Sequence, residues 1–433
     1  MKPSTSVPYA PVSKQSDPSG RPLAVAGVCA ARQPIFSSNG DVAGYELLYP
    51  RALSERPAGK AFRSATAADA MVRAFINLDL DLLTSGRPAF IGFTREMLLA
   101  GVYMLMPRNS VVVQLLKDVR PDDVVEEACE ELAEAGYTLA LDDFAWSPSY
   151  RHLLELASIV KVDALSQSPA RLDATAQRLA PYDVRLLAAG VETAEVRATC
   201  TGLGYELVQG GYYMRRQMVT SRAAALTSDE LTIVQAMNVL LDERATDADV
   251  RAVFCADLGL SHKLLRMVSL APEANGVDSV RPAVQHTARN ELRKWLALLL
   301  LSSIAARGGA SRELIHRAVQ RGRMCELLGG GTGPHCASQF LVGLFSLLDA
   351  LSGTPMSELL DAMALAPALR DALVLRTGPY ASALVLVEAY EQGAWETVSQ
   401  LARLSGRSAA QVGASYMQSL AWTRRRLLSL AAA

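Results

Sequence analysis

Residues 28–49 read VCAARQPIFSSNGDVAGYELLY, two apolar and β-branched runs separated by Ser37-Ser38-Asn39-Gly40-Asp41. A five-residue connection that contains Asn-Gly is typical of a β-hairpin. We therefore predict antiparallel strands over Val28–Phe36 and Val42–Tyr49. Because Pro34 cannot donate a ladder hydrogen bond, it favours an edge or a bulge in the first strand.

Six further short apolar runs follow this hairpin, and helix-period segments separate most of them. The predicted strands are Ala89–Phe93, Val111–Leu115, Thr138–Leu141, Ile159–Val162, Val184–Ala188 and Glu206–Val208. The predicted helices include Ala65–Leu83, Asp122–Ala135, Pro169–Leu179 and Ala194–Leu203, and Gly136 follows the second as a helix-ending glycine. Strands that alternate with helices indicate a parallel sheet, and eight strands are the number that closes a TIM-like barrel. The fold class is therefore α/β, with an antiparallel hairpin at its start.

After Ser221 the strand pattern ends, and the rest of the chain is predicted to be all-α. Expected helices include Glu230–Leu241, Val280–Leu301, Arg312–Leu328, Ala337–Leu351 and Ser408–Leu430, with Trp295–Ala306, apolar nearly all round, at the centre of the bundle. Residues 1–22, rich in Pro, Ser and Gly, are expected to be disordered. The predicted domains are thus a lead-in over 1–22, a barrel over 23–221 and a helical bundle over 222–433.

The composition limits the classes of partner and the compartment. Forty-three Lys and Arg against 44 Asp and Glu leave a net charge of −1, which indicates neither a nucleic-acid nor a membrane partner. The six cysteines form no CxxC pair, which is typical of reduced thiols. The apolar run Trp295–Ala306 is too short to span a bilayer, for which ~20 residues are needed. Leu23–Ala31 imitates a short signal-peptide core, but five prolines and Asp17 precede it. We expect a cytoplasmic protein.

Polar residues lie at the ends of most predicted barrel strands, where loops converge on one face. They are Glu46, Gln114, Asp142, Asp143, Lys161, Asp163, Glu192 and Gln209. Clustered carboxylates and a lysine are typical of a divalent-metal and phosphate site, although each residue alone could be a solvated strand-end charge. A glycosidase pair is a further alternative. Lys161 and the 6% aromatic content weigh against it, since sugar platforms are usually aromatic.

Six motifs in fixed order give the first half a family resemblance. They are Gln33-Pro34-Ile35, Gly44-Tyr45-Glu46-Leu47-Leu48, Leu141-Asp142-Asp143-Phe144, Val160-Lys161-Val162-Asp163, Ala189-Gly190-Val191-Glu192-Thr193 and Gln209-Gly210. Residues 26–220 resemble an EAL domain on these motifs. Active members of that family hydrolyse one phosphodiester bond of cyclic di-GMP with two divalent metals.

The resemblance implies roles for individual residues. Gly92 stands where the family has a metal-binding Asn, Gln114 where it has a metal-binding Glu, and Ala189 where a Glu activates water. Pro50 stands where the family has a phosphate-contacting Arg, with Arg51 one position later. The ligand-binding candidates are Gln33, Glu46, Leu48, Arg51, Asp142, Asp143, Lys161, Glu192 and Gln209. Two charges and one amide ligand of the family's metal site are thus missing. We therefore expect no metal cofactor, or one weak metal site at Glu46 and Asp142. Mg²⁺ or Mn²⁺ would be needed only for residual activity.

The second half resembles the HDOD domain, a relative of the HD phosphohydrolases, most clearly over Asp257-Leu258-Gly259-Leu260-Ser261-His262-Lys263-Leu264-Leu265-Arg266. None of the five histidines is followed by Asp, so the metal-binding dipeptide of the HD enzymes is missing. His262, His286 and His316 are expected on helix surfaces or at caps, and Arg424-Arg425-Arg426 on a solvated helix end.

Together the two resemblances imply a catalytically inactive EAL–HDOD signalling adaptor. Such a protein would act through protein partners and as a cyclic di-GMP effector, with a homodimer expected from the family. The alternative is a weak residual cyclic di-GMP phosphodiesterase.

Overall fold

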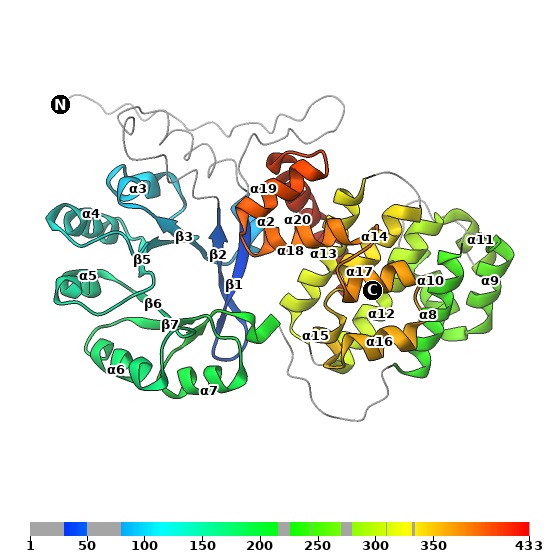
Figure 1. The fold of residues 1–433 in the computed structure, drawn as a ribbon, viewed down its shortest axis with the longest axis horizontal. Helices are drawn as coiled ribbons and strands as arrows, with labels where there is room; N and C mark the ends of the chain where they lie inside the picture. Colours follow the sequence, from blue (N-terminus) through cyan, green and yellow to red (C-terminus); the bar gives the residue numbers. More distant parts are fainter. Residues whose placement is uncertain are drawn as a thin grey trace, which may run out of the picture.

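The computed structural model describes residues 30–49, 79–214, 226–242, 244–269, 279–308, 310–330 and 334–432. A barrel forms one half of the molecule and a helical assembly forms the other (Figure 1). The predicted helix Ala65–Leu83 lies mostly outside the described residues, as do the proposed lead-in 1–22 and Arg51.

Eight described strands close into the predicted barrel in the order β1 to β8. The strands are β1 (Ala31–Ser37), β2 (Val42–Leu48), β3 (Ala89–Phe93), β4 (Val111–Leu115), β5 (Thr138–Leu141), β6 (Ile159–Asp163), β7 (Arg185–Ala189) and β8 (Leu207–Val208). Strand β1 runs antiparallel to both β2 and β8, and the other neighbours are parallel. The predicted hairpin is confirmed. Pro34 lies beside a register shift at Ile35/Phe36 and outside the short pairing with β8.

The inside of the barrel begins with an apolar layer that every second residue supplies. Its members are Ile35, Phe90, Val112, Ala140, Ile159, Leu187 and Leu207. At Gly44 a Cβ would lie 2.8 Å from the Phe90 ring, so glycine lets this large side chain fill the barrel. Two residues further along the strands most of the inward positions are polar, with Gly92 and Ala189 as exceptions, and this second layer holds the candidate site.

Helices and 3₁₀ turns alternate with the barrel strands. They are α2 (Leu80–Thr84), α3 (Arg95–Leu99), η2 (Val102–Leu105), α4 (Asp123–Glu134), η3 (Pro148–Tyr150), α5 (Arg151–Leu156), α6 (Pro169–Leu179), α7 (Ala194–Gly202) and η4 (Gly211–Met214). Local chemistry sets the ends of α4: the Asp122 side chain accepts from Val125 N–H at the start, and Gly136 follows the end at φ +82°.

From Ser228 onward the described residues form helices and connections. The helices are α8 (Ser228–Leu241), α9 (Asp247–Ala256), α10 (Leu258–Ser269), α11 (Val280–His286), α12 (Arg289–Gly308), α13 (Arg312–Gly329), α14 (Pro334–Phe345), α15 (Leu348–Ser352), α16 (Met356–Met363), α17 (Pro367–Val374), α18 (Ala381–Glu391), α19 (Trp395–Leu404) and α20 (Ala409–Ala432). Capping boxes start α8 at Thr227 and α9 at Thr246.

Two of the predicted helices are each divided in the structure. The span Ala337–Leu351 is divided between α14 and α15, with Leu347 at φ −120° and ψ 14° between them. The span Val280–Leu301 is divided between α11 and α12, because Thr287 adopts an extended conformation at φ −100° and ψ 123°. A β-branched Thr has a low helix propensity, and an apolar pattern that continues through it hides the break. The run Trp295–Ala306 lies within α12, where most of its side chains are buried.

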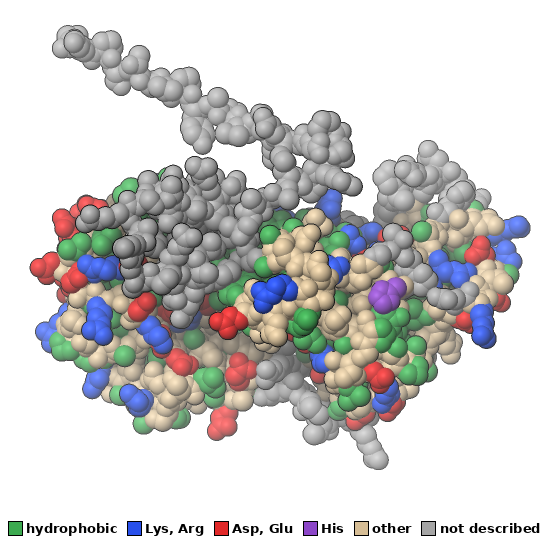
Figure 2. Space-filling model, turned by 45° about the horizontal axis from the view of Figure 1, so that its top comes forward, with side chains coloured by type: hydrophobic (Ala, Val, Ile, Leu, Met, Phe, Trp, Pro, Cys, Tyr) green, Lys and Arg blue, Asp and Glu red, His purple; other side chains and the backbone are tan. Residues whose placement is uncertain are grey.

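On the face in Figure 2, basic and acidic side chains are interspersed over both halves. Among the described helices, none combines the length and the apolar character needed to cross a membrane. The two halves meet along the β1–β2 hairpin, where α18, from the far end of the sequence, contacts β1 (Figure 1).

Candidate functional site

Glu46 is the centre of the polar layer inside the barrel. It comes from β2, and its carboxylate accepts hydrogen bonds from Gln114 Nε2 on β4 (2.9 Å), Lys161 Nζ on β6 (2.8 Å) and Gln209 Nε2 after β8 (2.6 Å). Lys161 Nζ also lies 3.3 Å from Asp142 Oδ1 at the end of β5. The predicted convergence of strand-end residues therefore occurs for these five.

The charges in this layer compensate one another within the protein. Burial alone would raise the pKa of Glu46, but the Lys161 ammonium and the hydrogen bonds from Lys161, Gln209 and Gln114 lower it. Burial raises the pKa of Asp142, and the neighbouring Glu46 charge raises it further against the opposing effect of Lys161. Although burial disfavours the charged amine, both carboxylates raise the pKa of Lys161. The site thus holds a buried internal cation between two acids.

The other site candidates lie around this centre with different partners. Gln33 is directly opposite Glu46 in the β1–β2 pairing, so its side chain shares that face of the hairpin. Asp143 forms an exposed ion pair with Lys117 at 2.9 Å. Glu192 Oε1 accepts from the backbone N–H of Gly211 at 3.1 Å, which directs this carboxylate to the loop after β8. Asp163 Oδ1 accepts from Leu165 N–H at 2.9 Å.

Leu48 ends β2 on the same strand face as Glu46, and it contacts the helical half. A Cβ on Gly393 would lie 3.0 Å from Leu48 Cδ1. Leu48 therefore joins the rim of the barrel to the turn between α18 and α19.

The space beside Gly92 is filled by residues that sequence reasoning missed. A Cβ at Gly92 would lie 2.8 Å from Leu116 Cδ2 and 3.6 Å from Tyr49 Oη. The Tyr49 hydroxyl donates to the Gly92 carbonyl. Burial, and then the charge of Glu46, raise the pKa of Tyr49. Neither residue belongs to a strand-end polar pattern, so only the three-dimensional packing reveals them.

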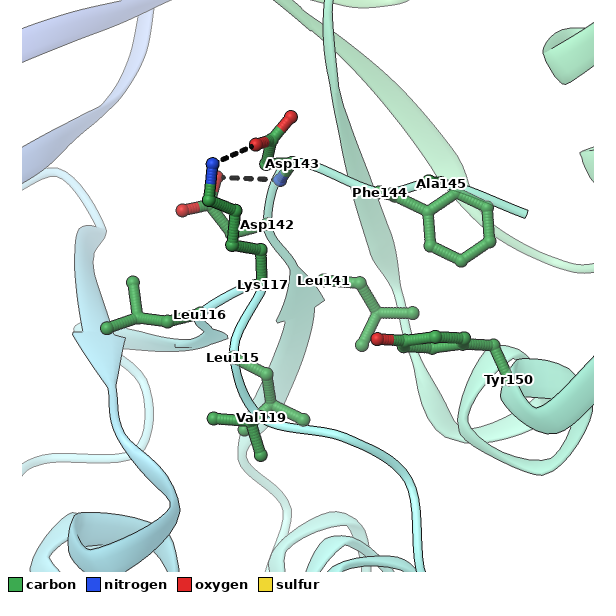
Figure 3. Close-up of a pocket in the computed structure, with 10 residues that line it drawn as sticks. All are labelled: Leu115, Leu116, Lys117, Val119, Leu141, Asp142, Asp143, Phe144, Ala145 and Tyr150. Carbon is green, nitrogen blue, oxygen red and sulfur yellow. Dashed lines mark hydrogen bonds and ion pairs between the residues drawn. The ribbon is translucent and has the colours of Figure 1, made fainter. Parts of the chain in front are cut away.

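A cavity of about 400 Å³ opens beside the Asp142–Asp143 pair (Figure 3). Its walls come from the ends of β4 and β5 and from the segments that follow these two strands. They comprise Leu115, Leu116, Lys117, Val119, Leu141, Asp142, Asp143, Phe144, Ala145 and Tyr150. Phe144 and Tyr150 meet edge to face with ring centroids 5.5 Å apart. Apolar walls with charged groups at one end are typical of a small-molecule site, and the volume lies near the lower limit for such pockets.

The polar layer does not fit a divalent metal. Lys161 occupies the position between Glu46 and Asp142 where a cation would bind, and the Glu46 oxygens already accept from Gln114 and Gln209. Within the described ranges, no cluster of three or more His, Cys, Asp or Glu residues could hold a metal ion. Hard cations need several free oxygen ligands, and this arrangement supplies few.

Comparison with known proteins identifies the family of this chain. The chain is 30% identical over 381 residues to the cyclic di-GMP phosphodiesterase CdgJ of Vibrio cholerae, an alignment that covers 86% of each protein. The chain belongs to the EAL family of cyclic di-GMP phosphodiesterase-like proteins. It is also 28% identical over 404 residues to YuxH of Bacillus subtilis, which covers 91% of this chain and 98% of that protein. A search of protein-family models gave no match.

Solved EAL structures also match this EAL-family chain. A standalone EAL protein from Vibrio cholerae O395, in its cyclic di-GMP-bound form, is 23% identical, with a TM-score of 0.34 over 43% of this chain and 90% of that one. The cAMP-bound EAL enzyme Bd1971 is 18% identical, with a TM-score of 0.34 over 42% of this chain and 60% of that one.

Histidine placement in the helical half corrects one prediction. His316 was expected on a helix surface or at a cap, but it lies partly buried on α13, where Nδ1 is 3.2 Å from Arg32 Nη2 of β1. Sequence periodicity within α13 could not show that the barrel packs on this face. His262 on α10 is exposed, and the His286 side chain lies outside what the structure describes. The three arginines Arg424-Arg425-Arg426 are exposed, and Arg426 pairs with Glu291 at 2.9 Å.

Proposed function

We propose that this EAL-family protein is a catalytically inactive EAL–HDOD signalling adaptor whose barrel binds cyclic di-GMP without hydrolysing it. The observation that carries the proposal is that Glu46 accepts hydrogen bonds from Gln114, Lys161 and Gln209. Glu46 is the carboxylate that the EAL name motif contributes to the metal site. Here both of its oxygens already accept from donors of the chain itself, Oε1 from Gln114 and Lys161 and Oε2 from Gln209.

Three substitutions support the absence of hydrolysis. Gln114 and Ala189 each replace a family glutamate, which removes two negative charges from a cage that must neutralise two divalent ions. Gly92 replaces the metal-binding Asn, and Leu116 fills the space that a side chain there would need. Loss of a general base typically costs 10²–10⁴-fold in rate, and loss of the second metal removes the clamp on the attacking and leaving oxygens.

Nucleotide binding is supported by the polar residues of the family motifs that this chain retains. Lys161, Asp142 and Gln209 are in the barrel mouth, and the cavity beside Asp142 has room for a small molecule.

The helical half is proposed to be an HDOD domain that passes the barrel's state to a protein partner in the cytoplasm, with a homodimer as the functional unit. The HDOD-like segment from Asp257 to Arg266 starts helix α10. Its Asp257 side chain accepts from Leu260 N–H at 2.6 Å, which caps the helix and leaves the motif with a structural role.

A residual phosphodiesterase is the second candidate, because the relative CdgJ carries that name at 30% identity. In that case Glu46, Asp142, Asp143 and Glu192 would surround one weakly held metal. The structure places Glu192 on the Gly211 backbone, so this candidate requires that side chain to move.

Calorimetric titration with cyclic di-GMP in Ca²⁺ tests the proposal. We expect saturable binding at micromolar or lower concentration, and no linear dinucleotide after long incubation of concentrated protein with Mn²⁺. Ala145→Trp should fill the cavity and weaken binding at least tenfold, whereas Ala180→Trp, at an exposed position on the end of α6, should not. Turnover in Mn²⁺ would favour the phosphodiesterase. No heat from correctly folded protein would contradict a nucleotide site and leave protein docking as the barrel's role.

A further inference from the structure

Strand β2 is held from outside the barrel by helix α13. The Tyr45 hydroxyl donates to Glu313 Oε2 at 2.7 Å, and Arg32 Nη2 of the adjacent strand lies 3.4 Å from Glu313 Oε1. The Arg32 guanidinium also lies over the Tyr45 ring, 4.3 Å from its centroid. The Arg32 side chain is 3% exposed and the Glu313 side chain 11%, so this contact is shielded from solvent. Because Tyr45 directly precedes Glu46, the hydrogen bond from Tyr45 to α13 lies one residue away from the central carboxylate of the site.

The rim of the same strand is contacted by the turn between α18 and α19. Gly393 has φ +70° and packs against Leu48, so closely that an added Cβ would be 3.0 Å from Leu48 Cδ1. Leu48 is two residues beyond Glu46 and shares its strand face. The helical half therefore contacts β2 on both sides of Glu46: at Tyr45 from the outer face and at Leu48 from the rim.

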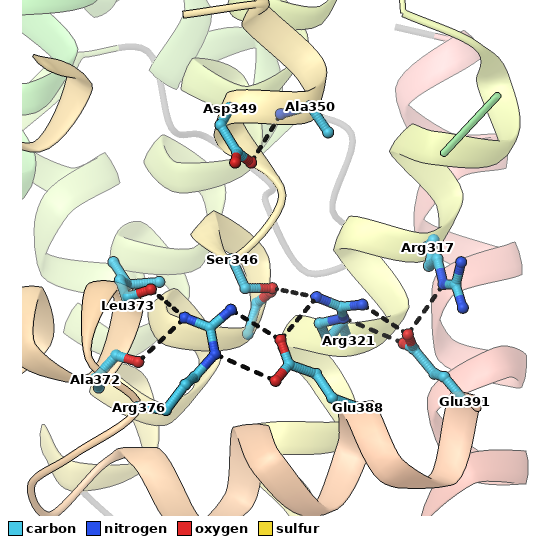
Figure 4. Close-up of polar contacts among 11 residues, drawn as sticks. Arg317, Arg321, Ser346, Asp349, Ala350, Ala372, Leu373, Arg376, Glu388 and Glu391 are labelled. Carbon is cyan, nitrogen blue, oxygen red and sulfur yellow. Dashed lines mark hydrogen bonds and ion pairs between the residues drawn. The ribbon is translucent and has the colours of Figure 1, made fainter. Parts of the chain in front are cut away.

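A buried cluster of arginines and glutamates fixes α13 and α18 to each other (Figure 4). Arg321 Nη2 is 2.7 Å from Glu391 Oε2, and Arg317 Nε is 3.0 Å from the same oxygen. Glu388 adds a contact to Arg321 at 3.5 Å and to Arg376 at 2.9 Å. Glu391 lies two residues before Gly393, and Arg317 lies one turn after Glu313. The cluster thus sets the spacing between the two elements that hold β2.

We propose that these contacts form a clamp through which the helical half controls the barrel site. The clamp consists of Glu313 on Tyr45 and Arg32, Gly393 on Leu48, and the Arg321–Glu391 pair that joins α13 to α18. A partner that shifts α13 against α18 would move β2, and with it Glu46, relative to Gln114, Lys161 and Gln209. Packed elements transmit such shifts because a close-packed interface changes between discrete arrangements. The ligand-dependent part of this inference rests on the proposed nucleotide site, whereas the control of β2 does not.

Hydrogen–deuterium exchange of the full chain tests the clamp without any ligand. Glu313→Gln keeps the side-chain shape but removes the charge that Arg32 and Tyr45 contact. We expect amides of residues 31–48 to exchange about tenfold faster or more, since hydrogen bonds to charged groups are among the stronger ones. Strands β4 to β6 should be unaffected. The matched variant Glu358→Gln, at an exposed position on α16, should leave the exchange of residues 31–48 unchanged. Unchanged exchange in 31–48, or an equal rise in β4 to β6, would overturn the clamp.

A second pair of variants tests the rim contact. Gly393→Ala and Gly406→Ala both place alanine at positive φ, +70° and +69°, but only the first meets a neighbour, because a Cβ at Gly406 has nothing within 4 Å. We expect faster exchange around residues 46–48 and weaker cyclic di-GMP binding, by about tenfold, in Gly393→Ala alone. Equal effects in both variants would overturn the rim contact as a control point. If the wild type binds no nucleotide, the proposed function fails while the exchange result still decides the clamp.

Discussion

Lys161 is the residue that determines the electrostatics of the barrel interior. Its ammonium lies 2.8 Å from Glu46 and 3.3 Å from Asp142, and the three side chains are between 11% and 18% exposed. A buried acid stays charged only when a partner compensates the lost hydration. Lys161 provides that compensation for both acids, so one lysine serves the role that a cation would serve in a metal site.

Removal of this cation is expected to destabilise the fold. Lys161→Met should lower the free energy of unfolding at pH 7 by about 3–5 kcal/mol, because two buried carboxylates lose their shared partner. Lys117→Met is the matched control: Lys117 pairs with Asp143 at the surface, and such pairs contribute about 0–1 kcal/mol. Urea denaturation measures both. The deficit of Lys161→Met should shrink as the pH falls and the carboxyl groups become neutral, and a deficit equal to that of the control would contradict the assignment.

Gln114→Glu introduces the charge that the EAL resemblance implies at this position and should create a metal-dependent stability. Gln114 Nε2 now lies 2.9 Å from Glu46 Oε1. The substitution would put a third carboxylate of the polar layer in the place of this amide. Without metal the variant should be less stable than the wild type. With Mn²⁺ at ten times its dissociation constant, the variant should gain about 1.4 kcal/mol. Thermal unfolding with Mn²⁺ and with EDTA measures the effect, and an equal response of wild type and variant would contradict it.

Sequence reasoning located these residues because they lie in or at the ends of predicted strands, and the strand ends of a barrel converge on one face. Glu46, Asp142, Lys161 and Gln209 could be grouped in this way before any coordinates. The packing of Leu116 and Tyr49 around Gly92 could not, because it depends on side-chain volumes from separate strands. The same holds for Glu192, whose hydrogen bond to Gly211 depends on the path of the loop after β8.

At the scale of elements, the packing of α13 against α18 depends on charged groups. The Arg321 side chain is 8% exposed and that of Glu391 is 7% exposed, and Arg321 Nη1 also donates to Ser346 Oγ at 2.9 Å. Burial by itself would raise the pKa of Glu391, but Arg317 and Arg321 lower it. The sequence predicted α13 as a helix over nearly its full length. The pairing of its arginines with acids about 70 residues away is a tertiary property that helical periodicity does not encode.

Glu391→Gln should therefore be strongly destabilising. The change replaces the acid that Arg321 and Arg317 share by a neutral amide and leaves Arg321 the longer contact to Glu388 at 3.5 Å. Breaking a buried ion pair costs about 3–5 kcal/mol. Glu127→Gln, at an exposed position in α4, should change the stability by less than about 0.5 kcal/mol. Guanidinium denaturation of both variants measures the difference. Similar midpoints for the two variants would show that the cluster does not hold α13 to α18.

At the scale of the whole molecule, the two halves share one apolar core. Buried residues of the outer barrel wall and of the helices form a single contiguous cluster, whereas the barrel interior forms a separate small one. The Tyr390 hydroxyl of α18 donates to the carbonyl of Ala30, just before β1, at 3.1 Å. Helical residues thus cover the antiparallel hairpin from outside. The order of elements predicted a barrel and a bundle, but it did not predict that the bundle covers this hairpin.

His316 makes this junction sensitive to acid. Burial, and then the adjacent Arg32 charge, lower the pKa of His316 to about 3. The unfolded chain, with an ordinary histidine pKa near 6.5, binds this proton more readily, so the stability of the folded protein falls as the pH drops from about 6.5 toward 3. The same junction also contains the titratable groups of Glu313, Arg32 and Tyr416. Their contributions to the pH dependence of stability remain when His316 alone is replaced.

The pH dependence of two histidine variants tests this coupling. Between pH 7 and pH 5, the melting temperature of the wild type should fall more steeply than that of His316→Gln, which cannot take up the proton. The exposed His262→Gln should keep the wild-type slope. Exchange of the hairpin amides should accelerate with acid in the wild type more than in His316→Gln, because protonation places a second cation 3.2 Å from Arg32. Parallel pH profiles for all three proteins would show that His316 does not titrate at the junction, and that acid acts through carboxylates elsewhere.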